Sequence, residues 1–152
     1  MNNEIEELIE RAQDRYLAAE ELDTLEAYVQ SLPERINLYK LLRDREVDIM
    51  QAVADRTEGE LPKVAEEDLE RGIKNLILVV RYCAMGMLLN DEEFIKVRLL
   101  KWLEQIVSQF DMRSLNETLY KSLNQVLKEE LSNEQLGLMQ PLITSAQVTL
   151  IY

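Results

Sequence analysis

The sequence contains no histidine and only one cysteine, Cys83. The lack of histidine excludes Ser-His and Cys-His catalytic pairs, histidine-based zinc sites, haem held by a proximal histidine, and di-iron centres that pair Glu with His. A single cysteine excludes an internal disulfide and is typical of a protein in a reducing cytosol. Any catalysis would therefore depend on carboxylates, Lys, Tyr or Ser.

Glycine and proline are also scarce, with four and three residues among 152. No glycine-rich phosphate loop is present, which excludes the usual nucleotide sites. Glycine and proline weaken helices, whereas the abundant Leu, Glu, Ala, Gln and Lys favour them. Hydrophobic residues make up 47% of the chain, enough for a sizeable core. We therefore predict a single ordered domain that is all-α.

Basic residues are few: the chain has 17 Lys and Arg but 29 Asp and Glu, which gives a net charge of −12. This balance excludes nucleic-acid binding and disfavours docking on anionic lipid. The acidic stretch from Met1 to Glu10 lacks the order of a signal peptide, so we expect none. Lys74 and Arg81 interrupt the longest apolar run, so we predict no membrane span.

The segment Glu66–Leu89 organises the chain. Its apolar residues recur every three or four positions, the pattern of a central helix buried on one face. These residues are Leu69, Ile73, Leu76, Ile77, Val80 and Ala84. Three acids, Glu66, Glu67 and Asp68, open the segment and suit the positive end of a helix dipole. They are also the best carboxylates available to an enzyme, but a solvated helix start explains them more simply, so we rank an enzyme last.

The N-terminal stretch Asn2–Arg15 is predicted to be a short amphipathic helix. Ile5, Leu8 and Ile9 lie on one face and glutamates surround them. The helix either folds back onto its own core or acts as an arm that docks on a partner. Composition alone favours the first interpretation.

Two helices are predicted next, Glu20–Leu32 and Pro33–Arg56, separated by a capping box from Ser31 to Glu34. The loop Thr57–Ala65 should follow. The positions predicted to face inward in the first helix are Leu22, Leu25, Tyr28, Val29 and Leu32. The apolar positions of the second helix are Ile36, Leu38, Leu41, Leu42, Val47, Ile49, Met50 and Val53.

Three further capping boxes are predicted after the central helix, at Asn90, Ser114 and Ser132, each with Glu or Gln three residues later. Pro141 should kink or break the last helix. The helix after Asn90 has its apolar positions at Phe94, Val97, Leu100, Leu103, Val107 and Phe110, with Trp102 off that line. The total is about seven or eight helices, close to the globin plan.

Two stretches carry a resemblance to a known family. One runs from RYLAAEELD to AVADR, Arg15 to Arg56; the other runs from Leu69 to Tyr82 and on through LLNDEEFIKVRLL to SLNQVL. Their order of helices and breaks resembles the phycobiliproteins, the globin-like light-harvesting subunits of cyanobacterial phycobilisomes. The resemblance implies an all-α, globin-like phycobiliprotein fold, with residues 1–15 as an N-terminal arm and 16–152 as the core of one domain.

The central helix departs from the family motif, which is Cys-x-Arg-Asp followed by two tyrosines, an arginine and a further tyrosine. Aligned on Tyr82, only the first motif arginine, Arg71, is kept. The bilin-attaching cysteine falls on Leu69 and the aspartate on Gly72. The two tyrosines and the second arginine fall on Asn75, Leu76 and Leu78.

These departures remove the chemistry of a bilin site. Leucine cannot form a thioether, and Gly72 offers no carboxylate to a buried cationic tetrapyrrole. We predict that Arg71 lies at the surface or pairs with Glu67 or Glu70. Cys83 lies about four helical turns from Leu69 and is predicted to be a small buried side chain.

The resemblance therefore implies a non-enzymatic, bilin-free subunit that acts as an assembly, structural or regulatory protein for phycobilisomes or photosystems. In the family, the N-terminal arm pairs similar subunits, so Ile5, Leu8 and Ile9 are the predicted partner-binding residues. The partner would be a phycobiliprotein-like or photosystem-associated protein, or a second copy in a homodimer. We expect it in the cytoplasm or at the cytoplasmic face of the thylakoid membrane.

Two alternatives stay open. The chain could carry or sense a linear tetrapyrrole, held noncovalently or through Cys83, with Arg71 and Tyr82 as its contacts. It could also be a globin-like helical signalling module that binds no pigment.

Overall fold

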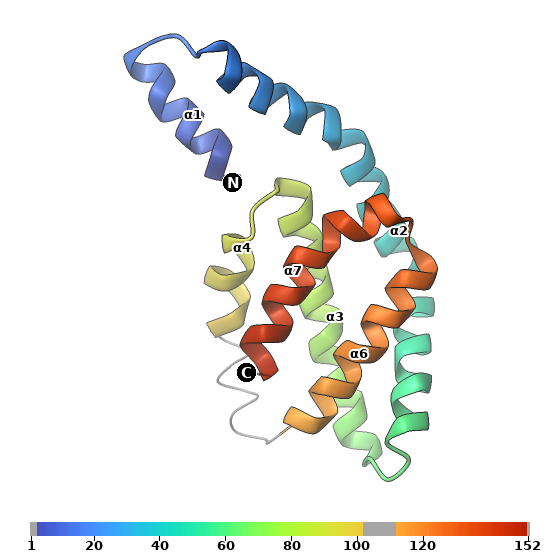
Figure 1. Ribbon diagram of the computed structural model, residues 1–152. Helices are drawn as coiled ribbons and strands as arrows, with labels where there is room; N and C mark the ends of the chain where they lie inside the picture. Colours follow the sequence, from blue (N-terminus) through green and yellow to red (C-terminus); the bar gives the residue numbers. More distant parts are fainter. Residues whose placement is uncertain (1–2, 102–111, 152) are drawn as a thin grey trace.

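The computed structural model describes residues 3–101 and 112–151. Every regular element in these ranges is helical, so the all-α prediction is confirmed for them (Figure 1). The elements are α1 (Asn3–Asp14), α2 (Ala19–Glu60), α3 (Glu66–Leu89), α4 (Glu93–Ile95), the π-helical turn η1 (Lys96–Leu100), α6 (Arg113–Glu130) and α7 (Asn133–Ile151). The predictions for Trp102, Leu103, Val107 and Phe110 lie outside the described residues.

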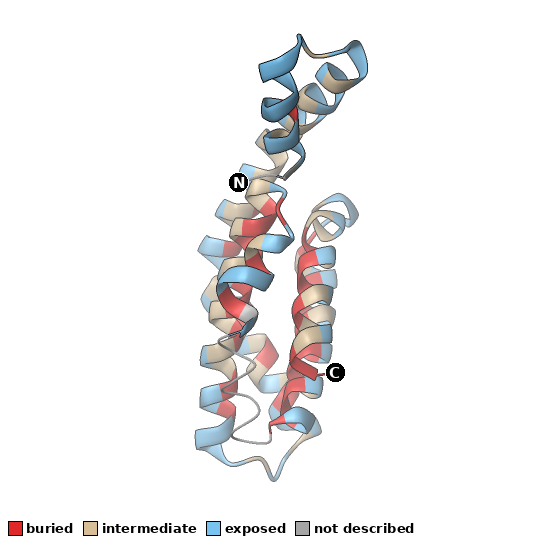
Figure 2. Ribbon diagram, turned by 90° about the vertical axis from the view of Figure 1, so that its left-hand side faces the viewer, coloured by how far each residue is buried: buried red, intermediate tan, exposed pale blue. Residues whose placement is uncertain are grey.

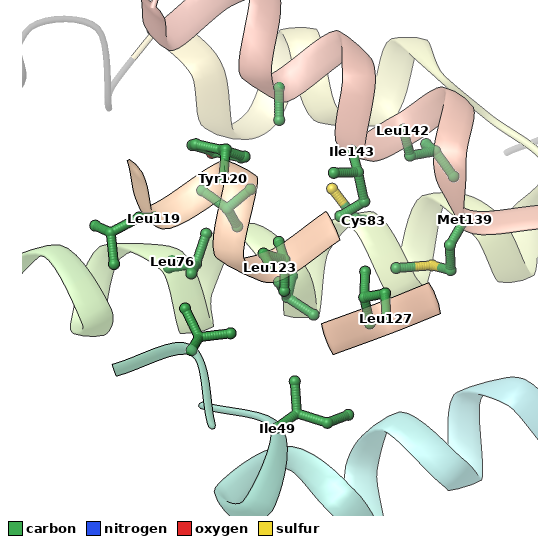
Figure 3. Close-up of a cluster of buried hydrophobic side chains, with 14 of the residues drawn as sticks. Ile49, Leu76, Cys83, Leu119, Tyr120, Leu123, Leu127, Met139, Leu142 and Ile143 are labelled. Atoms are coloured by element: carbon green, nitrogen blue, oxygen red, sulfur yellow. The ribbon is translucent and has the colours of Figure 1, made fainter. Parts of the chain in front are cut away.

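The core is built around α3, as the sequence predicts. Helices α2, α6 and α7 each pack against it. Figure 3 shows the result, with Leu76 and Cys83 of α3 meeting Leu123 of α6, Ile143 of α7 and Ile49 of α2. All five side chains are at most 2% exposed. Burying such a side chain contributes about 1.5–3 kcal/mol, so these contacts hold the helices together.

Two glycines of α3 let its neighbours approach closely. A Cβ atom at Gly72 would lie 2.7 Å from Leu119 Cδ1 of α6, and one at Gly86 would lie 2.9 Å from Leu142 Cδ2 of α7. Both distances are shorter than carbon atoms tolerate. A larger residue at either position would require the Leu119 or Leu142 side chain to move, and at Gly86 it would also meet the Asp91 carbonyl oxygen at 3.0 Å.

Helix α3 is also long and apolar enough to cross a membrane, by length and composition alone. Its most apolar 18-residue window has a mean hydropathy of 1.5, and 44% of that window is buried inside the protein. A core helix of a soluble protein meets the same criterion. The packing of α3 against three other helices supports the prediction that it does not span a membrane.

Helix α2 runs unbroken for 42 residues, so the two helices predicted on either side of Ser31 are one, and that prediction is wrong. The Ser31 hydroxyl donates to the Tyr28 carbonyl 2.7 Å away and accepts from Arg35 Nε at 2.8 Å, instead of capping a new helix. Pro33 is exposed inside the helix. Proline has no backbone N–H, so the helix loses one hydrogen bond at this point. Such a loss bends a helix more often than it ends the helix. The two halves of α2 indeed run in different directions (Figure 1).

The predicted loop Thr57–Ala65 begins too early, because α2 continues to Glu60. Thr57 is fully buried, and its hydroxyl donates to the Val53 carbonyl at 2.8 Å. A polar side chain that bonds to its own helix can be buried without breaking it.

One of the three later capping boxes is confirmed. The Ser132 hydroxyl accepts from the Gln135 N–H at 3.2 Å, and the Gln135 side chain accepts from the Ser132 N–H at 3.1 Å. The prediction of a capping box at Ser114 is wrong, because α6 begins at Arg113 and no side chain caps its first turn. Helix α7 passes through Pro141 and changes direction along its length (Figure 1).

The prediction of a capping box at Asn90 is wrong as well, because Asn90 is the C-terminal cap of α3 and does not start a new helix. Its φ of 51° is left-handed, a conformation that asparagine tolerates at a helix C-terminus. The next residue does the capping: Asp91 Oδ1 accepts from the Phe94 N–H at 3.2 Å.

The first half of α2 projects beyond the core. The first buried residue of α2 is Leu38. Leu22 and Val29 are 46% and 52% exposed, so the prediction that they face inward is wrong. Leu25, Tyr28 and Leu32 are only half-buried. The reason is visible in Figures 1 and 2: among the described residues only α1 runs beside this part of α2.

Candidate functional site

Helix α1 folds back beside the start of α2, and Glu21 fastens this hairpin. Its carboxylate accepts from Arg15 at 2.7 Å, from Arg11 at 3.3 Å and from the Ala18 N–H at 2.9 Å. The bond from Arg15, followed by that from Ala18, lowers the Glu21 pKa to about 2. The role of Glu21 is not predicted from the sequence. A signal was present, because Arg11 and Arg15 are four residues apart and so lie on one face of α1, where both can bond to one acid.

The three predicted anchor residues of α1 do not share one environment. Leu8 is buried at 6% exposure and Ile5 is half-buried, so both support the hairpin itself. Ile9 is 50% exposed and is the one of the three that a partner could reach readily.

A line of exposed apolar side chains runs down the outer face of α2. These are Leu22, Val29, Ile36 and Val47, which we call the α2 stripe; they are 46%, 52%, 42% and 78% exposed. With 3.6 residues per turn, all four fall within about 40° of one another around the helix. Their spacing is that of any apolar helix face, which is why Leu22 and Val29 are predicted to face inward although both are exposed. Tyr16, in the connector before α2, is 99% exposed.

The opposite side of this half of α2 is bonded to the end of α3. The Tyr28 hydroxyl donates to the Leu88 carbonyl at 3.0 Å, and Arg35 donates to the Met87 carbonyl. The Arg35 guanidinium also lies 5.8 Å from the centre of the Tyr28 ring. These contacts fix which face of α2 turns outward, and they leave the stripe exposed to solvent.

A groove of about 280 Å³ lies between α2 and α3 beside the stripe. Leu42, Met50 and Val80 are among the apolar residues that line it, and Arg43 and Arg81 are its cationic ones. Arg81 makes two hydrogen bonds to Glu46, at 2.7 and 2.9 Å, which tie α3 to α2. The bond from Arg81 lowers the Glu46 pKa. The groove is thus apolar at its base and charged at its rim.

The first turns of α3 are closely packed where they meet α6. Leu69 is 8% exposed, and the cavity beside Gly72 has a volume of only about 10 Å³. Such a volume holds about one water molecule.

Most of the chain matches one known family. The family model described as phycobilisome protein matches residues 8–149. The chain belongs to the phycobilisome protein family. No curated protein matches the sequence.

Family membership confirms the resemblance and the globin-like, all-α fold predicted from the sequence. It makes the chain a phycobiliprotein-like subunit, in a family of structural light-harvesting proteins that are not enzymes. Phycobilisome proteins assemble with other phycobiliproteins and associate with the cytoplasmic side of thylakoids.

The pigment of the phycobilisome family does not fit the residues at its motif positions here. The side chain at the cysteine position is the buried Leu69, which has no thiol. At the aspartate position, a side chain on Gly72 would meet Leu119 at 2.7 Å. The two motif positions thus offer neither the thiol nor the carboxylate, although Leu69 also lines an open groove of about 500 Å³ beside two acids of α2 and two of α3.

Arg71 and Tyr82, the proposed contacts of a noncovalent bilin, are not brought together. Eleven residues separate them along α3, which is about 16 Å. Arg71 is exposed, as predicted, and its guanidinium lies 3.8 Å from the Asp68 carboxylate. Tyr82 stacks on Phe94 with ring centres 5.8 Å apart.

Cys83 is fully buried, as the sequence predicts. Burial raises the pKa of its thiol to about 12. A reactive cysteine needs a low pKa and access to solvent, and Cys83 has neither.

Proposed function

We propose that this chain is a bilin-free member of the phycobilisome family that acts through protein–protein contacts, as an assembly, structural or regulatory subunit for phycobilisomes or photosystems. The observation that carries the proposal is the absence of the thiol and the carboxylate from the motif positions of α3, where Leu69 and Gly72 stand. A Cβ atom alone at Gly72 would already overlap Leu119. The proposal excludes catalysis.

Two physical points support a pigment-free chain. A thioether needs a thiol on the first turn of α3, where Leu69 stands. A buried cationic tetrapyrrole needs a nearby carboxylate, because an unpaired buried charge is costly. A carboxylate at position 72 would in addition require the Leu119 side chain to move, because a Cβ atom there lies 2.7 Å from Leu119 Cδ1.

Two further points support a role in association. The outer face of the arm and of α2 exposes apolar side chains that a stable monomer would normally cover. The hairpin is held rigidly by Glu21, so Ile9 and the α2 stripe are presented in a fixed geometry. Ile5 and Leu8 maintain the hairpin, and Ile9 contacts the partner.

The first test concerns pigment. The protein is purified from cells that supply a linear tetrapyrrole, and its visible absorption is measured before and after denaturation. We expect no visible band. A band that denaturation removes would favour a noncovalent carrier, and loss of that band in Arg71→Ala and Tyr82→Phe would locate the site. A band that survives denaturation would mean attachment through Cys83.

The second test concerns partners. The tagged chain is recovered from a cyanobacterium that contains phycobilisomes, and co-purified proteins are identified. We expect phycobilisome or photosystem components, and we expect Ile9→Glu to lose them. Val148→Glu is the control, because Val148 is 53% exposed on α7, far along the chain from the arm. Recovery of neither group of proteins would favour the signalling module.

A further inference from the structure

We propose that the groove between α2 and α3 binds a small anionic amphiphile, a medium-chain carboxylate whose alkyl chain lies on the apolar base and whose carboxylate lies between Arg43 and Arg81. This inference goes beyond the proposed function and does not depend on it. The groove is lined by two helices that pack against each other in the core, so the site is part of the folded chain.

The base of the groove is formed by core side chains. Leu42, Ile49, Met50 and Ala84 are at most 5% exposed, and Val80 is 7% exposed. All of them belong to the main hydrophobic cluster, so their positions are set by the packing of the core. An alkyl chain that leaves water for these side chains gains the free energy of apolar burial.

The volume of the groove limits the size of the ligand. At about 280 Å³ it lies just below the ~300–1,000 Å³ of sites that take drug-sized molecules. With ~30 Å³ for a group about the size of a water molecule, this volume holds a chain of roughly eight to ten carbons. A linear tetrapyrrole is larger than this and would not be enclosed.

Two arginines and a tyrosine form the polar end of the site. The pKa of Arg81 is raised by its hydrogen bond to Glu46 and, to a smaller degree, by Tyr39. The pKa of Arg43 is raised by its hydrogen bond to Asp44 and, to a smaller degree, by Tyr39. The phenol therefore lies close to both guanidinium groups. A hydroxyl and two guanidinium groups on the rim of one groove are suitable donors for a carboxylate.

Both arginines have nitrogen atoms left for a ligand. Arg81 bonds to Glu46 through Nε and Nη2, and Arg43 bonds to Asp44 through Nε. Their other guanidinium nitrogens make no hydrogen bond within residues 3–101 and 112–151. Arg43 and Asp44 are 62% and 63% exposed, and an exposed ion pair of this kind contributes little, so a ligand can replace it.

The charge of the lining differs in sign from the charge of the chain. Two arginines and one glutamate line the groove, whereas the whole chain carries −12. The negative chain repels polyanions and anionic lipid surfaces, but a single carboxylate meets the local excess of positive charge. The ligand is therefore a free amphiphile with one negative charge.

A series of ligands tests the chemistry of the site. Titration calorimetry of the full chain with hexanoate, octanoate and decanoate should give affinities that rise about fourfold for each added methylene. The gain should stop once the groove is full, before tetradecanoate. Octylammonium, which has the same chain as octanoate but a positive head, should bind at least tenfold more weakly. Absence of carboxylate binding, or equal affinity for the two head groups, would overturn the proposal.

Substitutions on the rim locate the site. Arg43→Ala should weaken octanoate binding at least tenfold and Tyr39→Phe severalfold, because each removes a donor to the carboxylate. Arg98→Ala is the control, since Arg98 is an exposed arginine of η1 that does not line the groove, and it should bind like wild type. Equal losses in Arg43→Ala and Arg98→Ala would show general attraction of an anion and would reject this site.

Glu46 gives a test with the opposite sign. Its carboxylate occupies Arg81, so it competes with the ligand for the same donors. Glu46→Gln should therefore tighten octanoate binding about fivefold, whereas damage to the packing of α2 on α3 would weaken it. Circular dichroism shows whether the variant keeps its helices. Weaker binding by a folded Glu46→Gln chain would exclude Arg81 from the site.

Discussion

The two halves of α2 belong to one helix but lie in different surroundings. In the half from Leu38 onward, Leu38 and Val53 are fully buried, and Arg45 and Arg56 bond to Glu130 and Glu129 of α6. The half before Leu38 has no buried residue and is tied to the core only near the end of α3. Figure 2 shows the change from a largely blue and tan helix to one with a buried side.

This difference shows that an apolar helix face does not reveal which element, if any, packs against it. The spacing of Leu22, Val29 and Ile36 is as regular as that of the buried residues in the other half. In one half the neighbouring helices come from the same chain. In the other, Leu22, Val29 and Ile36 are exposed among the described residues.

The largest expected effect is on the core side, at Gly72. Gly72→Asp should lower the free energy of unfolding by about 3 kcal/mol, because the side chain overlaps Leu119 and buries an unpaired carboxylate. Gly59→Asp is the matched control, since a Cβ atom at Gly59 meets nothing within 4 Å. Urea unfolding followed by circular dichroism compares the two. Equal losses would show that α6 gives way and that the pigment position is not closed.

An effect of similar size is expected at Leu123 of α6, and Leu22 of α2 gives the comparison between the two halves of the fold. Leu123→Ala should cost about 2–5 kcal/mol, because Leu123 is fully buried. Leu22→Ala should change the free energy of unfolding by less than about 0.5 kcal/mol. Both are measured by urea unfolding followed by circular dichroism. A large cost at Leu22 would mean that the projecting half is held by its own chain.

The smallest effect concerns the hairpin and pH. The Glu21 pKa of about 2 lies below its ordinary value of 4.5. A lowered pKa stabilises the folded form fully above pH 4.5 and loses this contribution as pH falls toward 2. We therefore expect the NMR signals of Ala18 and Arg15 to shift between pH 4.5 and 2, and Glu21→Gln to abolish that shift. An unchanged titration in the variant would exclude Glu21 as its source.

The sequence predicts the central helix and the hairpin helix closely, because both have strong amphipathic patterns and clear ends. Residues 66–89 are predicted as a helix and form α3, and α1 ends at Asp14, one residue before the predicted end. The Ser132 capping box is also correct, because that motif makes its bonds within four residues and needs no other part of the fold.

The incorrect predictions concern residues whose contacts are made with distant parts of the chain. Ser31, Pro33 and Glu34 have the residue types of a helix start, but the helix continues there because Tyr28 and Arg35 bond to the end of α3 on the same stretch. Leu22 and Val29 are predicted to face inward because the spacing of apolar residues does not distinguish a face that packs within the chain from one that is exposed. A single carboxylate joins three donors across the turn between α1 and α2, and no short motif encodes that contact.

Cys83 gives this molecule a built-in reporter. With a pKa of about 12, only about one thiol in ten thousand is ionised at pH 8, and the intact core shields it from reagents. Its alkylation must therefore wait for α3 to separate from α6 and α7, so the rate of labelling measures how often the core opens. Because the sequence has one cysteine, no other thiol competes for the reagent. The chain can thus accept a second, engineered cysteine on the arm and have only that one labelled while the core stays closed.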